Sequence, residues 1–369
     1  MNCFDFLHRF IVFILVQWHL ISVFSMLCRT LDTNMMCCHL TKEDAECIST
    51  IVENFANCEN MLKNPAPRYS IWAIGVLSLL GAVCVLVLRH FLKEKNVVQV
   101  IMLMNLAVAD GLMGVYLITI AVIDRLWSGE YYLHDFQWRF GLSCRITGAI
   151  SVLSSEVSAM LLTLISADRL KNIVFPYRGR ALTRRKAHIL CMVVWLVGFT
   201  IAFLPISGIH YFNDRLGRRA YYSRSVVCLP LQLSAIFPPG WEYSAAIFTG
   251  LNFLLTIFMI VAYVIIFLKS FLSNRRLARQ GTSREIKARA KSSTTKRETA
   301  LAKRFAFIIF TDCACWMPII VFGIKFLVEK DFYPTSDLPV LMVVFVLPIN
   351  SALNPIIYTL STPKVRNNT

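Results

Sequence analysis

The chain has 369 residues, of which 56% are hydrophobic and only 16% are charged, and its formal net charge is +16. Soluble domains are about 45–50% apolar and about 25% charged, so the composition excludes an ordinary soluble domain and indicates a membrane protein. The positive charge does not indicate nucleic acid as a partner. The basic residues of the chain cluster in short loops between apolar segments, where they face anionic inner-leaflet lipid.

The first part of the chain predicts a targeting segment and a short extracellular head. In residues 1–28, His8 and Arg9 precede an apolar run, which predicts a signal peptide. An uncleaved membrane anchor is the alternative, because the sequence has no clear small-x-small cleavage motif. Residues 29–68 are polar and predict a head too small for a core of its own. Four cysteines fall in this head, and the sequence does not determine their pairing: Cys37, Cys38, Cys47 and Cys58.

Seven apolar segments follow, each long enough to cross a bilayer. They are 70–88, 97–123, 145–167, 187–206, 243–268, 304–326 and 338–360. Residues 69–362 therefore predict an all-α bundle of seven transmembrane helices, followed by a short tail at 363–369. The loops and tail on one side carry 24 Lys and Arg residues, against 12 on the other side. Because cytoplasmic loops carry the excess of basic residues, we expect the N-terminus outside and the loop 269–304 inside.

Polar residues inside the spans are informative, since a charge at the bilayer centre costs about 2.5–3.5 kcal/mol. From the helical rise, Asp110 lies about 21 Å into the second span, and Ser158 lies about 16 Å from the cytoplasmic end of the third. The seventh span places Asn350, Ser351 and Asn354 at a similar depth. Oxygen atoms of these kinds suit Na⁺, so the five residues predict a buried sodium site. A hydrogen-bonded packing network with Asp110 protonated explains the same spacing equally well.

Charged and phenolic side chains gather at the cytoplasmic ends of the spans. Arg169 is predicted to face inward beside Asp168, and Glu298, at the start of the sixth span, can pair with Arg169. An exposed pair is usually worth about 0–1 kcal/mol. A small term is nevertheless enough to bias a two-state switch. Tyr263 and Tyr358 lie at the same level and can receive Arg169 once it is released.

Two prolines predict kinks in the last two spans. Pro318 cannot make its backbone hydrogen bond and therefore kinks the sixth span two residues after Trp316. Trp316 is a candidate pivot at this kink, and core packing is its plainer role. Pro355 has the same effect in the seventh span.

A disulfide is expected at the outer surface. Cys144 begins the third span, and Cys228 lies in the long second outer loop. The extracellular compartment is oxidising, which favours a disulfide between them over two free thiols.

Several motifs resemble those of the rhodopsin-class G-protein-coupled receptors. The matching stretches cover roughly residues 68–362 and occur in the expected order: Asn105–Asp110, Asp168-Arg169, Trp195, Cys315–Pro318 and Asn354–Tyr358. The resemblance implies a multi-pass receptor of the plasma membrane, surrounded by lipid, that couples to a heterotrimeric G protein. It also implies a G-protein-contacting surface that includes Arg169, Pro176 and Tyr177.

Finer features resemble the leucine-rich-repeat-containing hormone receptors, and especially the relaxin receptors. The stretches concerned are Cys58–Leu62, Ser128–Tyr132, Ser155–Ser158, Phe310–Asp312 and Leu347–Pro355. This resemblance implies a relaxin- or insulin-like peptide hormone as ligand and cyclic AMP as the downstream signal.

The chain also departs from the pattern of these families. Ala82 replaces a near-universal asparagine, Leu170 replaces a tyrosine, and Asn252 stands in place of the usual proline, as in relaxin receptors. A head of forty residues cannot hold leucine-rich repeats. Two hypotheses therefore remain: a signalling receptor, or a truncated, signalling-incompetent decoy that dimerises with a complete receptor. No catalytic constellation or cofactor motif indicates an enzyme.

Overall fold

A computed structural model defines residue 38 and residues 56–91, 96–174, 182–213, 221–223, 225–230, 239–279, 293–329 and 347–360. Within these ranges the regular structure is entirely helical. Six helical segments are long and apolar enough to cross a membrane. They are α2 (Pro65–Phe91), α3 (Val97–Leu126), α5 (Leu142–Val174), α6 (Arg184–Phe203), a composite segment ending in α8 (Asn252–Arg279), and α10 (Ser293–Val328).

The predicted seventh span is represented by α12 (Leu347–Leu360). Its first part, residues 338–346, lies outside the described residues. The predicted signal peptide, the middle of the loop 269–304 and the tail 363–369 also lie outside them.

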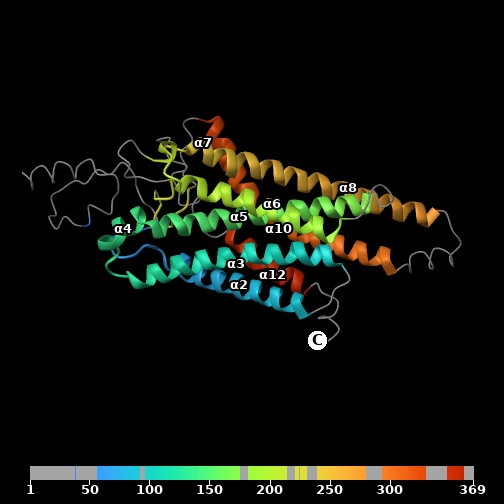
Figure 1. Cartoon of the computed structure of the whole chain (residues 1–369), viewed down its shortest axis with the longest axis horizontal. Helices are drawn as coiled ribbons and strands as arrows, with labels where there is room; N and C mark the ends of the chain where they lie inside the picture. Colours follow the sequence, from blue (N-terminus) through green and yellow to red (C-terminus); the bar gives the residue numbers. More distant parts are fainter. Residues whose placement is uncertain are drawn as a thin grey trace, which may run out of the picture. The chain divides into compact units, whose positions relative to one another are not determined.

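The chain forms two compact units, and the second, residues 66–122 with 139–369, is the helix bundle. Within it α5 contacts α6, α8 and α10. In the most apolar 18-residue stretch of each helix, 78% of α5 is buried inside the protein, against 22% of the fourth span, which contains α6. Figure 1 shows α5, in green, running lengthwise among the other long helices. The third span is therefore the central helix, and α6 presents an apolar surface suited to lipid.

The fifth span contains an irregular turn. It begins with α7 (Trp241–Ser244), continues as the π-helix η4 (Ala245–Leu251) and returns to α-helical geometry in α8. The Asn252 side-chain amide donates to the carbonyl oxygen of Ile247 at 3.2 Å, in addition to the bond that the Asn252 backbone N–H makes to the same oxygen at the wider turn. The side chain at the usual proline position thus supports the irregular geometry.

The sixth and seventh spans contain the two predicted prolines. Pro318 lies inside α10, and Pro355 lies inside α12. Gly81 of α2 faces Pro355, where a Cβ atom would come within 2.7 Å of the proline ring. The absence of a side chain at Gly81 therefore lets α2 approach α12 closely.

The first unit joins the head, residues 1–65, to the first outer loop, residues 123–138. Of the four head cysteines, Cys38 and Cys58 form a disulfide, while Cys37 and Cys47 lie outside the described residues. Backbone N–H groups of the loop donate to the head: Gly129 to the Glu59 oxygen at 2.7 Å, and Tyr132 to the Cys58 oxygen at 3.0 Å. The head is thus attached to the loop by main-chain hydrogen bonds.

A buried hydrogen bond completes this attachment. The backbone N–H of Leu62 donates to Asp124 Oδ1 at 3.0 Å. Leu62 and its neighbour Met61 are almost fully buried, and Asp124 is 2% exposed. The segment immediately before the first span is therefore held in place by a side chain at the outer end of α3.

Replacing Asp124 by alanine should loosen this attachment. The Leu62 N–H would stay buried without its acceptor, which costs about 1–3 kcal/mol. We expect faster proteolysis at the head and reduced surface expression, measured by flow cytometry. Ser128→Ala is the control, because it removes an exposed hydrogen bond to Asn60 and should have little effect. Equal behaviour of the two variants would contradict the prediction.

Candidate functional site

The loop between the fourth and fifth spans, which is the predicted second outer loop, is anchored to one end of the bundle. Cys144 and Cys228 form the expected disulfide. The phenol of Tyr116 on α3 donates to the Val227 carbonyl oxygen at 2.8 Å. Both Val227 and Cys228 are buried. This part of the loop is consequently fixed to α3 and α5.

A cluster of aromatic rings fixes the same loop to the fourth and fifth spans. Tyr222 donates through its phenol to the Ala202 carbonyl oxygen at 2.6 Å. Tyr221 shares a 2.7 Å hydrogen bond with Ser244 and packs edge-to-face against Phe212. Burial, followed by the charges of neighbouring groups, raises the pKa of the Tyr222 phenol well above its usual value. Tyr222 therefore stays neutral and keeps donating at physiological pH.

Three of the predicted sodium-site residues come together in the bundle. Asp110 Oδ1 accepts from Ser158 Oγ at 3.1 Å and from Asn354 Nδ2 at 3.4 Å. All three side chains are buried. The side-chain oxygen of Asn354, Oδ1, has no partner among the described residues. Carboxylate, hydroxyl and amide oxygens are thus available together, which fits a hard monovalent cation.

The structure corrects the placement of Asn350. Its amide donates to Asp312 Oδ1 on α10 at 2.6 Å and not to Asp110. Asn350 lies four residues nearer the outside than Asn354, at the level of Asp312. The fifth predicted residue, Ser351, is buried beside it.

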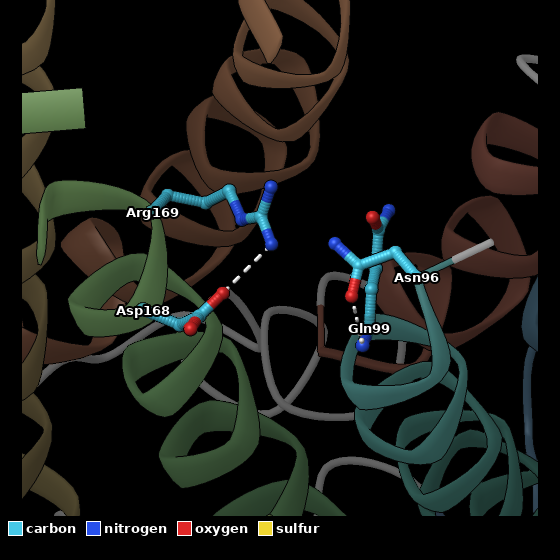
Figure 2. A network of polar contacts seen from close by, with 4 residues as sticks. All are labelled: Asn96, Gln99, Asp168 and Arg169. Atoms are coloured by element: carbon cyan, nitrogen blue, oxygen red, sulfur yellow. Dashed lines mark hydrogen bonds and ion pairs between the residues drawn. The ribbon is translucent and has the colours of Figure 1, made fainter. Parts of the chain in front are cut away.

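The cytoplasmic pair is formed within α5. Arg169 donates from Nη2 to Asp168 Oδ2 at 2.7 Å, and both side chains are buried. Figure 2 shows this pair together with the first turn of α3, where Asn96 accepts from the backbone N–H of Gln99 at 3.3 Å. The guanidinium is therefore held by its neighbour on the same helix.

The other predicted switch residues are only partly described. The Tyr263 hydroxyl is buried and has no hydrogen-bond partner among the described residues, so it can accept a hydrogen bond from an incoming guanidinium. Trp316 is 2% exposed and packs in the core one turn from Asp312. The side chains of Glu298 and Tyr358 lie outside the described residues, as do Pro176 and Tyr177. Their roles remain predictions.

A second polar group lies in the bundle, and we call it the acid–amide cluster: Glu156, Asn252, Asp312 and Asn350. Glu156 Oε1 accepts from Asn252 Nδ2 at 2.9 Å. Asp312 and Asn350 form a second hydrogen bond of the same acid–amide kind. Glu156 lies within the predicted third span, and its spacing in the sequence does not indicate a partner. The missed signal was a second polar residue, Asn252, replacing proline in the facing span.

The motifs and the helix bundle agree with the comparison to known families. Residues 80–358 match the family described as "7 transmembrane receptor (rhodopsin family)". The chain therefore belongs to the rhodopsin family of seven-transmembrane receptors. It is a multi-pass plasma-membrane receptor and not an enzyme.

Comparison with individual proteins shows which members of this family the chain resembles. G-protein coupled receptor GRL101 of Lymnaea stagnalis is 36% identical over 331 residues, which cover 90% of this chain and 28% of that protein. Relaxin receptor 1 of Mus musculus is 34% identical over 311 residues, covering 84% and 38%. Thyrotropin receptor of Felis catus is 30% identical over 314 residues, covering 84% and 37%. The similarity to relaxin receptors is confirmed, and the chain spans less than two fifths of each of these relatives.

Proposed function

We propose that this receptor transmits an extracellular hormone signal to a heterotrimeric G protein. The observation that carries the proposal is the buried ion pair of Arg169 with Asp168 at the cytoplasmic end of the central helix. A guanidinium that is fully buried in the resting bundle can contact a partner only after the helices move apart. Such a group suits a switch between a closed and an open state.

The proposed opening separates the sixth span from the third. Pro318 interrupts the backbone hydrogen bonds of α10, so this helix can bend there at low cost. When Arg169 leaves Asp168, the unpartnered hydroxyl of Tyr263 is available to it. A ligand has only to bind the open bundle more tightly than the closed one.

The input is proposed to reach the bundle through the head. We place the head outside the cell, because the basic residues lie in the opposite loops. Movement of the head would act on α3 through the Leu62–Asp124 hydrogen bond. Because several similar proteins are named relaxin receptors, a relaxin- or insulin-like peptide is our candidate ligand, with cyclic AMP as the signal.

This topology can be tested in intact cells. An epitope placed immediately after Cys58 should be labelled by an impermeant antibody before permeabilisation. An epitope in the loop 269–304 should be labelled only afterwards. The reverse pattern would contradict the proposed orientation.

The signalling proposal is tested with a chimaera. The hormone-binding ectodomain of a relaxin receptor is joined in front of Cys58, and cyclic AMP is measured after relaxin is added. We expect a dose-dependent rise that Arg169→Ala removes at matched surface expression. A chimaera that binds relaxin at the surface without producing a signal through any G protein would contradict the proposal.

We also propose Na⁺ as a ligand of Asp110, Ser158 and Asn354. NaCl should raise the thermal unfolding temperature of the detergent-solubilised protein above that in a bulky-cation salt of equal ionic strength. Binding to the folded state stabilises it by mass action. Asp110→Asn removes the charge that attracts the cation and should abolish the difference. A sodium response that persists in this variant would place the cation elsewhere.

A further inference from the structure

The acid–amide cluster contains more acceptors than donors. Each carboxyl uses one oxygen for an amide hydrogen bond, from Asn252 to Glu156 and from Asn350 to Asp312. The second oxygens, Glu156 Oε2 and Asp312 Oδ2, are buried and have no partner among the described residues. The carbonyl oxygens of both asparagine side chains are likewise buried without a described partner.

The two carboxyls lie on helices that contact each other. Glu156 belongs to α5 and Asp312 to α10. Both are almost fully buried, at 0% and 1% exposure. Two like charges in a low-dielectric interior repel strongly unless a positive charge lies with them.

No described basic side chain can supply that charge. On α5 the nearest are Arg145 and Arg169, which lie eleven and thirteen residues from Glu156 and so about 16 and 20 Å along the helix. On α10 the nearest described basic side chain is Lys325, thirteen residues from Asp312. Among the described residues no basic side chain is placed to balance the cluster, and a bound cation would do so.

Thr256 adds an independent observation. It lies one turn after Asn252 on α8, on the same helical face, and is 2% exposed. Its hydroxyl oxygen has no partner among the described residues. This hydroxyl is a further buried oxygen one turn from Asn252, and the side-chain atoms of these five residues that have no described partner are all oxygens.

We propose that the acid–amide cluster is a calcium site, separate from the candidate sodium site at Asp110. A divalent ion balances the two carboxylate charges with a single particle. Ca²⁺ accepts six to eight oxygen ligands at about 2.3–2.6 Å in flexible geometry, which suits side chains contributed by four helices. Mg²⁺ demands stricter octahedral geometry and keeps its waters. The ion would couple α5 and α8 to α10 and α12.

An ion fits this part of the bundle better than the cationic group of a larger ligand. The segment Val226–Leu229 is buried at the outer end of the bundle, and Tyr116 holds Val227 there. A peptide or organic amine would first have to displace this anchored segment. A single cation is much smaller than either ligand.

The test measures binding by the purified full chain and does not depend on signalling. CaCl₂ is compared with MgCl₂ and NaCl at equal ionic strength, and the thermal unfolding temperature is recorded. Tb³⁺ is used as a luminescent substitute for Ca²⁺, with Trp316, one turn from Asp312, as the sensitiser. We expect Ca²⁺ to raise the unfolding temperature more than either other cation and to quench the Tb³⁺ luminescence by competition.

Three variants make the assignment specific. Glu156→Gln and Asp312→Asn keep an acceptor for the asparagine amides, so the fold is preserved, but each should reduce the Tb³⁺ luminescence at least tenfold. Asp135→Asn is the matched control, since it neutralises a buried acid that belongs to the first unit and not to the bundle, and it should leave the Ca²⁺ response intact. Trp316→Phe should remove the luminescence while the Ca²⁺ shift in unfolding temperature remains.

Four results would overturn the proposal. The first is a Ca²⁺ response that survives both cluster substitutions. The second is an equal response to Mg²⁺, or to Na⁺ in a protein that also carries Asp110→Asn. The third is stabilisation by a small organic ammonium ion but not by Ca²⁺, and the fourth is no response to any cation. Because hormone and G protein are absent, a negative result here leaves the proposed signalling function independently testable.

Discussion

Replacing Asp168 by asparagine is expected to raise basal signalling about five- to tenfold, a typical size for one coupling interaction. The Arg169 guanidinium is buried with the Asp168 carboxylate as its charged partner at 2.7 Å. Removing that charge raises the free energy of the closed state, because the buried guanidinium loses its favourable interaction with the adjacent carboxylate. The free energy of the open state rises less, because Arg169 contacts other groups in that state.

The companion variant should have the opposite effect. Arg169→Ala removes the group that the open state presents, so basal and ligand-dependent signals should both fall to background. Both variants are measured by a G-protein dissociation assay at matched surface expression. Lys325→Ala is a suitable control, because the pair that Lys325 makes with Glu329 is solvent-exposed and far from Arg169 in sequence. A basal signal that falls in Asp168→Asn would show that the pair supports the open state instead.

Gly148→Ala is expected to prevent correct folding. A Cβ atom at this position of α5 would overlap the Cys228 carbonyl oxygen and the Tyr222 ring. The Cys228 backbone cannot easily move away, because a disulfide links Cys228 to Cys144. Cys144 lies on α5 one turn before Gly148. Overpacking against a fixed backbone costs about 3 kcal/mol or more. We therefore expect most of the variant to be retained inside the cell.

Gly250→Ala is the matched control for this substitution. The nearest atom that its Cβ would meet is the Ala245 carbonyl oxygen at 3.8 Å, an ordinary contact distance. Surface expression, measured by cell-surface biotinylation, should be close to that of the wild type. Normal expression of Gly148→Ala would contradict the close packing of the second outer loop on α5.

The helix bundle and part of its polar interior followed from the sequence. Hydrophobic length located the spans, and counting residues from the helix ends placed Asp110 and Ser158 at one depth, where the structure pairs them. Spacing along a helix gives depth well, because the rise per residue is nearly constant. It gives the direction of a side chain less well.

Asn350 and Glu156 show where this reasoning was insufficient. The four-residue spacing predicted that Asn350 shares a helical face with Asn354. The Asn350 amide instead donates to Asp312 on α10. The Glu156–Asn252 pair follows the π-helical turn, which changes the rotation of the residues after it. No proline marks this turn in the sequence. The pair of Arg169 with Asp168 likewise depends on side-chain direction, and the predicted pair with Glu298 stays a prediction.

The central claim is that this bundle activates a G protein when Arg169 is released. It is tested most directly by nucleotide exchange on purified G proteins, with the wild type, Asp168→Asn and Arg169→Ala each reconstituted in lipid nanodiscs. For at least one class of Gα subunit, exchange should be fastest with Asp168→Asn, slower with the wild type and at background with Arg169→Ala. If all three folded proteins leave exchange at background for every class of Gα, the claim is contradicted and the chain is a non-signalling partner.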